Sequence, residues 1–113
     1  MKKIYSTAQQ EYLNAKNAFE EISKVLEKKI QTITVIREIQ QPEMEKLVVE
    51  TGFHQAFEKL TEAETNLINW SHEAIKQEQT YKDNVSHFEN MYANLHRNAE
   101  ARTTVIQLAM KLK

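Results

Sequence analysis

The chain contains a single glycine, Gly52, and a single proline, Pro42. These two residue types are the usual means by which a backbone makes a sharp turn. A chain of 113 residues with only one of each makes few tight turns, so its segments must be long. Long segments with few turns are typical of α-helices, and the sequence therefore predicts an all-α fold.

Length and composition predict one ordinary globular domain spanning residues 1–113. Apolar residues make up 41% of the chain and the formal net charge is −1, which argues against disorder. There is no cysteine, so neither a disulfide nor a thiolate metal site can form. The sequence has no apolar run of the length that a signal peptide or a membrane span needs, and we expect a cytoplasmic protein without membrane attachment.

The first segment carries a wide apolar stripe that predicts a helix over about residues 3–40. Its members recur every three or four residues, and only Lys29 is polar: Tyr5, Ala8, Tyr12, Ala15, Phe19, Ile22, Leu26, Lys29, Ile33 and Ile36. Ala18 and Val25 widen the stripe on one flank, which suits a helix with two neighbours. Proline disfavours helix in the residue before it and suits the first turn of a new helix, so Pro42 marks the boundary.

The second segment predicts a helix over about residues 43–78. All members of its stripe are apolar: Phe53, Ala56, Leu60, Ala63, Leu67, Trp70 and Ala74. We expect Gly52 to kink this helix, because glycine in a helix interior costs about 1 kcal/mol. The alternative is that Gly52 ends a short first helix.

The third segment has an apolar stripe with a different phase, which indicates an interruption near Gln79 and Thr80. The new stripe contains only one polar member: Val85, Phe88, Tyr92, Leu95, Ala99, Arg102, Ile106 and Ala109. Thr80 with Asp83 resembles a helix-starting pair, so we expect a helix over about 81–112. Three helices of similar length predict an antiparallel three-helix bundle. The alternative is a helical hairpin whose second helix runs unbroken over 43–112, which would require an intertwined dimer.

No pattern in the sequence predicts catalysis, a cofactor or a metal. Neither Glu-x-x-His nor His-Glu-x-x-His occurs, and one glycine cannot form a phosphate-binding loop. The four histidines are therefore expected at the surface or half-buried. Lys24, Lys28 and Lys29 form a basic cluster that neighbouring glutamates dilute, so nucleic-acid binding is not expected.

Charge is unevenly distributed along the near-neutral chain. Residues 1–40 have a net charge of +2, residues 41–79 of −5 and residues 80–113 of +2. Arg102 falls on the apolar side of its segment, where we expect its aliphatic stem to pack while the guanidinium reaches water. The alternative is an ion pair with an acid of the middle helix.

The function that remains is a non-enzymatic protein–protein interaction module, acting as a homodimer or small adaptor through coiled-coil-like helix packing. The candidate partner contacts are Ile68, Trp70, Ile75, Met91, Tyr92 and Arg102, although aromatic residues at these positions also suit a core. Size and helicity resemble those of small helical chaperones of secreted proteins, including the Trp-x-Gly hairpins. However, Ser71 and His72 follow Trp70, so the defining motif is missing. A chaperone and, further behind, a metal-binding bundle are the alternatives.

Overall fold

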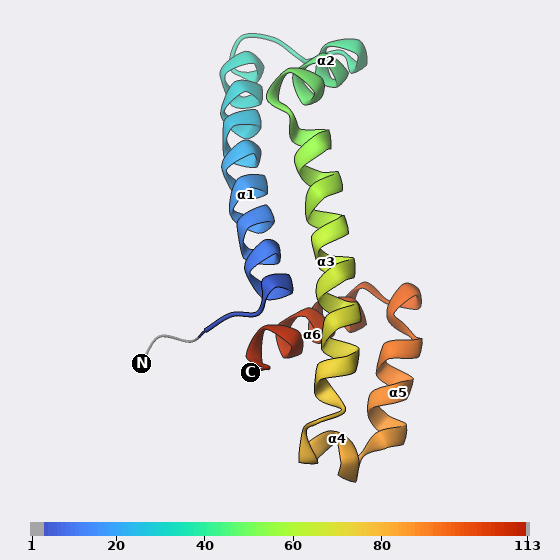
Figure 1. Cartoon of the computed structure of the whole chain (residues 1–113). Helices are drawn as coiled ribbons and strands as arrows, with labels where there is room; N and C mark the ends of the chain where they lie inside the picture. Colours follow the sequence, from blue (N-terminus) through green and yellow to red (C-terminus); the bar gives the residue numbers. More distant parts are fainter. Residues whose placement is uncertain (1–3, 113) are drawn as a thin grey trace. The chain divides into compact units, whose positions relative to one another are not determined.

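The computed structural model describes residues 4–112. These residues form six α-helices and one 3-10 turn, and none of them forms a strand (Figure 1): α1 Thr7–Thr34, α2 Gln41–Thr51, α3 Phe53–Ile75, α4 Gln79–Asp83, α5 Val85–Ala93, η1 Leu95–Arg97 and α6 Ala99–Lys111. The all-α prediction is confirmed. The division into three long helices is wrong, because the first predicted helix ends early and the second and third are each divided.

The chain divides into two compact units, and the division falls inside α1 and α3. Unit 1 comprises Met1–Glu11 and Ala63–Lys113, of which residues 4–11 and 63–112 are described. Unit 2 comprises Tyr12–Glu62. That the whole chain is one domain stays a prediction.

A capping box starts α1. The Ser6 backbone N–H donates to Gln9 Oε1 over 2.8 Å, and the Gln9 backbone N–H donates to Ser6 Oγ over 3.2 Å. This reciprocal arrangement satisfies amide groups that the first turn of a helix leaves without partners. The predicted start at residue 3 lies outside the described residues, and residues 4–6 are not helical.

Helix α1 ends at Thr34, six residues before the predicted boundary at residue 40. Five consecutive residues with β-branched side chains, Thr32 to Ile36, precede the break. Such side chains lose rotamer freedom in a helix, which lowers their helix propensity. The next helix, α2, begins at Gln41 with Pro42 and Glu43 in its first turn, and this part of the prediction is confirmed.

Gly52 ends α2 instead of kinking a continuous helix. Its φ of 76° is left-handed, and its N–H donates to Val49 O over 3.1 Å, as in a helix-terminating glycine. Helix α3 begins at the next residue, Phe53. The expectation of a kink is therefore wrong, and the alternative of a short first helix is correct.

We expect Gly52→Ala to lower the free energy of unfolding by about 1–2 kcal/mol, because left-handed backbone strains a residue with a Cβ atom. A Cβ atom would meet only Gln55 Oε1 at 3.9 Å, so the cost is conformational and not steric. Asparagine tolerates this conformation, and Gly52→Asn should be less destabilising than Gly52→Ala. Urea denaturation followed by circular dichroism measures both. Equal stability of the alanine variant and the wild type would contradict the assignment.

The chain leaves the helix again after Ile75, so the alternative of an unbroken helix over 43–112 is also wrong. Residues 76–78 are good helix formers, but tertiary packing overrides their helix propensity. Ile75 and Tyr81, on either side of the turn, are both buried in the same core, and the turn allows both side chains to reach it.

Asparagines mark the breaks inside the predicted helix 81–112. Asn84 Nδ2 donates to Thr80 O, Asn94 Nδ2 donates to Asn90 O, and Asn98 Oδ1 accepts from the Glu100 backbone N–H at the start of α6. Asparagine side chains compete in this way with the hydrogen bonds of the helix backbone. The predicted helix is therefore replaced by α4, α5, η1 and α6.

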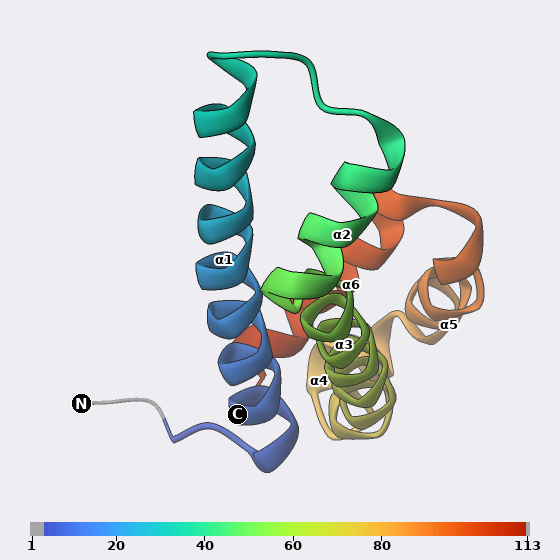
Figure 2. The same ribbon diagram turned by 90° about the horizontal axis from the view of Figure 1, so that it is seen from above.

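Unit 1 holds most of the core. Helix α5 runs back alongside the second half of α3, and α6 crosses the same part of α3 (Figures 1 and 2). The buried cluster draws on all four helices of this unit beyond residue 63: Ile68, Ile75, Tyr81, Tyr92, Val105 and Leu112. Ala63, Leu67 and Ala109 are buried in this unit as well.

Gln9 ties the first turn of α1 to the end of α6 within unit 1. Its fully buried Nε2 donates to Ala109 O over 2.8 Å and to Leu112 O over 2.9 Å. Carbonyls at the end of a helix have no partner inside the helix, so an external donor is needed when they are buried. Oε1 accepts from the Ser6 N–H, so both amide hydrogens and the amide oxygen of Gln9 have a partner.

Unit 2 packs residues 12–34 of α1 against α2 and the first turns of α3 (Figures 1 and 2). Phe19 lies between Phe53 and Phe57, with ring centroids 5.2 Å and 6.0 Å apart. Phe19 and Phe53 belong to the predicted stripes of the first and second segments, whereas Phe57 lies outside them.

Candidate functional site

The partner contacts proposed from the sequence lie in or against the core of unit 1. Ile68, Ile75 and Tyr92 are buried, whereas Trp70 and Met91 are half-buried and pack against them. A residue that anchors a partner must be reachable from solvent, so burial favours the core interpretation of the three buried side chains. Their role in binding a partner stays a prediction.

Arg102 forms an ion pair, although the sequence favoured a packed aliphatic stem with the guanidinium in water. Its Nε donates to Glu64 Oε2 over 3.1 Å, which connects α6 to α3 within unit 1. The alternative of an ion pair with an acid of the middle segment is therefore correct. Both side chains remain partly exposed, so the pair contributes at most about 1 kcal/mol.

A polar network joins α3, α4 and α5 in unit 1. Ser71 Oγ donates to Ile68 O, so its lone pairs accept the hydrogen of the Tyr92 hydroxyl at 2.7 Å. The His72 ring stacks on Tyr92 at 4.3 Å. Its Nε2 lies 3.0 Å and 3.1 Å from the two Glu89 oxygens, and the Tyr81 hydroxyl donates to Glu89 Oε1.

The serine hydroxyl of this network is inaccessible to solvent. Ser71 is fully buried, and its hydroxyl is engaged on both sides by Ile68 and Tyr92. His72 contacts Glu89 and stacks on Tyr92, and neither contact aims its ring at Ser71. The sequence missed the network because its hydrogen-bonded side-chain pairs lie 8 to 21 residues apart, a spacing without a motif.

Glu89 is the electrostatic centre of the network. Hydrogen bonds from Tyr81 and then from His72 hold the pKa of Glu89 below its ordinary value of 4.5. The same carboxylate, together with burial, raises the pKa of the Tyr81 hydroxyl. Burial raises the pKa of Tyr92, against the opposing effect of its hydrogen bond to Ser71.

The lowered pKa of Glu89 predicts a loss of stability in acid. The folded protein holds this proton less tightly than the unfolded chain, so the ionised carboxylate stabilises the fold fully above pH 4.5, and the effect is lost as pH falls through the lowered pKa. We expect the wild type to lose more stability than Glu89→Gln between about pH 5 and pH 3. Urea midpoints measured across this range test the difference. The control Glu62→Gln, at an exposed glutamate of unit 2, should keep the wild-type slope; an identical slope for Glu89→Gln would contradict the prediction.

The four histidines lie at the surface or half-buried, as the sequence predicted. His54, His87 and His96 are exposed and His72 is half-buried. His54 pairs with Glu58 one turn further along α3, at 2.9 Å. Within residues 4–112, no three His, Cys, Asp or Glu side chains are grouped so that they could hold a metal ion.

Unit 2 has a much thinner core than unit 1. Three apolar side chains are buried among its residues, Leu26, Leu47 and Ala56, against nine in the described part of unit 1. The stripe residues Ala15, Phe19 and Ile22 are only half-buried. Two long helical segments and one short helix therefore leave apolar surface that nothing in unit 2 covers.

The uncovered surface follows one side of α1, which we call the open flank: Ala15, Ala18, Ile22, Val25, Lys29 and Thr32. Ala18 and Val25 are exposed, Val25 by 50%. A shallow groove of about 180 Å³ separates its first three residues from Gly52, Ala56 and their neighbours on α3. A second hollow lies between Val25, Lys28, Lys29 and Thr32.

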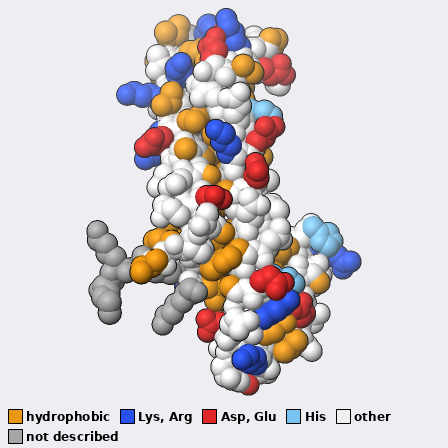
Figure 3. All heavy atoms as spheres, viewed as in Figure 1, with side chains coloured by type: hydrophobic (Ala, Val, Ile, Leu, Met, Phe, Trp, Pro, Cys, Tyr) orange, Lys and Arg blue, Asp and Glu red, His pale blue; other side chains and the backbone are white. Residues whose placement is uncertain are grey.

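Further exposed apolar residues surround the same unit. Val49 on α2 is exposed by 75% and Phe57 on α3 by 51%, and Val35 and Ile36 of the connection after α1 are exposed as well. In Figure 3 apolar side chains alternate with charged ones over α1, α2 and the start of α3. Position outside the stripes did not by itself predict exposure, because Val35 and Val49 are exposed whereas Ile68, Ile75 and Leu112, which also lie outside or at the margins of the stripes, are buried.

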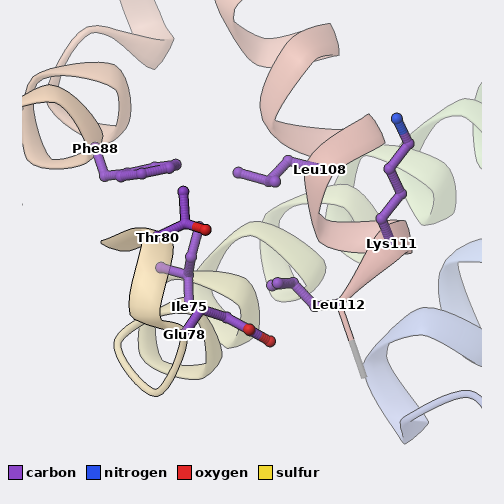
Figure 4. A pocket seen from close by; sticks show the side chains of 7 residues that line it. All are labelled: Ile75, Glu78, Thr80, Phe88, Leu108, Lys111 and Leu112. Atoms are coloured by element: carbon purple, nitrogen blue, oxygen red, sulfur yellow. The ribbon is translucent and has the colours of Figure 1, made fainter. Parts of the chain in front are cut away.

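Unit 1 carries a hollow of about 330 Å³ between the end of α3, α4, α5 and α6. Figure 4 shows Phe88 and Leu108 pointing toward one another across it, with the Lys111 ammonium directed away from both. Its polar side chains, Glu78, Thr80 and Lys111, are exposed and do not converge on one point. A binding site for a polar small molecule needs such convergence, so this hollow is a weaker candidate than the open flank.

No protein-family model, curated protein or solved structure shows significant similarity to this chain. None of the helices within residues 4–112 has both the length and the apolar character needed to cross a membrane. The geometry of the units is therefore the basis for any functional proposal.

Proposed function

We propose that this chain is a non-enzymatic protein–protein interaction module that packs the open flank of α1 against a helix of a protein partner. The main support for the proposal is the small number of buried apolar side chains in unit 2. The stripe residues Ala15, Phe19 and Ile22 of α1 are only half-buried there. Apolar surface that follows a helix at three- and four-residue spacing is the form of surface that another helix fits. A partner helix would complete in unit 2 the three-helix packing that the sequence predicted within one chain.

The charges around the flank suit a specific contact. Glu21, Lys28 and Lys29 border the exposed Val25 side chain and are themselves exposed. Charged residues at the rim of an apolar seam select the partner and its orientation more than they add affinity. A homodimer and an adaptor or chaperone would use the same surface, and they differ in the identity of the partner.

Site-specific photocrosslinking tests the proposal. A photoreactive amino acid at position 25, in the open flank, should give one discrete adduct in cells that express the protein. The same substitution at the exposed Thr103 of unit 1 is the matched control and should not give that adduct. Mass spectrometry identifies the polypeptide, and purified components should then reproduce the adduct. Absence of an adduct at position 25, or the same products from both positions, would contradict the proposal.

A further inference from the structure

The open flank has the spacing of a coiled-coil seam. Its residues alternate three and four positions apart from Ala15 to Thr32, and Ile22 and Val25 form its apolar centre. This seam shares Ala15, Ile22 and Lys29 with the stripe that the sequence predicted for the first segment, but is rotated toward Ala18 and Val25. One helix can thus present one side to its own chain and a neighbouring side to a second helix.

Two opposite charges border this seam on its outer edge. Glu21 and Lys28 are seven residues apart, so they lie on the same side of α1, two turns from one another. Both are exposed, and neither has an ion-pair partner among the described residues. The pair is arranged nearly symmetrically about the centre of the seam, between Ile22 and Val25.

The positions of Glu21 and Lys28 favour one orientation of the partner helix. In an antiparallel pair of identical helices, the residue before the centre of one copy faces the residue after the centre of the other. Glu21 of each copy would then face Lys28 of its partner copy, which makes two opposite-charge contacts. In a parallel pair the g positions of one helix face the e positions of the other, so Glu21 and Lys28 would lie opposite Leu26 and Ile33 and no opposite-charge contact would form.

We infer that a second copy of this chain covers the open flank, with the two α1 helices packed antiparallel about Ile22 and Val25. The inference rests on the proposed function and adds the identity and orientation of the partner. A contact with twofold symmetry uses the same surface on both copies, so that surface is fully occupied in the dimer and no larger oligomer forms through it. The apolar centre supplies the attraction, and the Glu21 to Lys28 contacts select the antiparallel register.

Charge reversal tests the inference directly. Light scattering coupled to size-exclusion chromatography, over a series of loading concentrations, gives the dissociation constant of the dimer. Glu21→Lys alone, or Lys28→Glu alone, turns both contacts into like-charge contacts and should weaken the dimer by at least about tenfold. Because both side chains are exposed, the circular dichroism spectrum and the urea midpoint should stay at wild-type values.

Mixing the two single variants gives the sharpest result. One chain then has lysine at both positions and the other has glutamate at both, so only the mixed antiparallel dimer has opposite charges facing one another. We expect the mixture to form a heterodimer with affinity close to that of the wild-type homodimer. The double variant Glu21→Lys with Lys28→Glu should likewise recover the homodimer. The matched control is Glu20→Lys, on the opposite side of α1, which should leave the dissociation constant unchanged.

Three results would overturn the inference. A wild type that remains monomeric at every concentration excludes the second copy, while an adduct from position 25 with a different protein would still support the proposed function. A wild-type dimer whose affinity is unaffected by either single reversal excludes this seam and this orientation. A dimer that both reversals weaken but the mixture does not restore excludes the antiparallel register.

Discussion

We expect Ile75→Ala to lower the free energy of unfolding by about 3 kcal/mol. Ile75 closes α3, is 2% exposed and belongs to the buried cluster of unit 1. Alanine removes its branched side chain and leaves a cavity that the helices around it refill only in part. Small proteins are stable by about 5–15 kcal/mol, so this loss is a large fraction of the total. Chemical denaturation followed by circular dichroism measures it.

The same substitution at Ile36 is the control. Ile36 lies in the connection after α1 and is 81% exposed, so Ile36→Ala should change stability by less than about 0.5 kcal/mol. The comparison also decides between two roles for Ile75, which the sequence offered as a partner contact. A core residue lowers the unfolding midpoint when truncated. A partner contact would instead leave the midpoint near that of Ile36→Ala and weaken association.

Replacing Gln9 with glutamate should be at least as damaging at neutral pH. The new carboxyl group keeps the oxygen that accepts from Ser6 but loses the amide that donates to Ala109 and Leu112. An ionised carboxylate would then face two carbonyl oxygens in a fully buried position. An uncompensated buried charge costs about 3–5 kcal/mol. We therefore expect Gln9→Glu to be destabilised by at least about 3 kcal/mol at pH 7.

This loss should be reversed in part by acid. Burial and the facing carbonyls favour the neutral form, so the folded-state pKa of the new carboxyl group is raised above its value in the unfolded chain. Its protonated form then stabilises the fold below the unfolded pKa, and this contribution is lost as pH rises through the folded pKa. Unfolding midpoints from pH 7 downward measure the recovery. Gln107→Glu, at an exposed position of α6, is the matched control and should show little loss at pH 7. A variant at position 9 as stable as this control would show that the bonds to the end of α6 are not needed.

Local signals predicted the helical content and some of the boundaries. The apolar stripes of the first two segments place Phe19, Leu26 and Ala56 on the packed sides of their helices, as the structure has them. Pro42 marks the start of a helix for a reason that acts between neighbouring residues. The capping box of Ser6 and Gln9 could have been recognised in the same way, because its signature is a fixed three-residue spacing.

Other helix boundaries depend on the conformation or hydrogen bonding of single residues, which the spacing of apolar residues does not predict. Gly52 could kink a helix or end it, and its left-handed φ decides for the end. Asn94 and Asn98 lie between members of the third apolar stripe without changing its spacing, so the stripe suggested one helix where the backbone forms several. Reading asparagines as competitors for backbone hydrogen bonds would have located these breaks.

The sequence by itself determined that the chain is helical and which side of each helix is apolar, because both follow from the composition and spacing of neighbouring residues. Only the tertiary structure decided which apolar residues are covered. It buries Ile68, Ile75 and Tyr92, which the sequence offered to a partner, and leaves Val25 in the open flank exposed. The reason is physical: burial depends on contacts between residues distant in sequence, and spacing along one helix does not show which of two adjacent faces its own chain occupies.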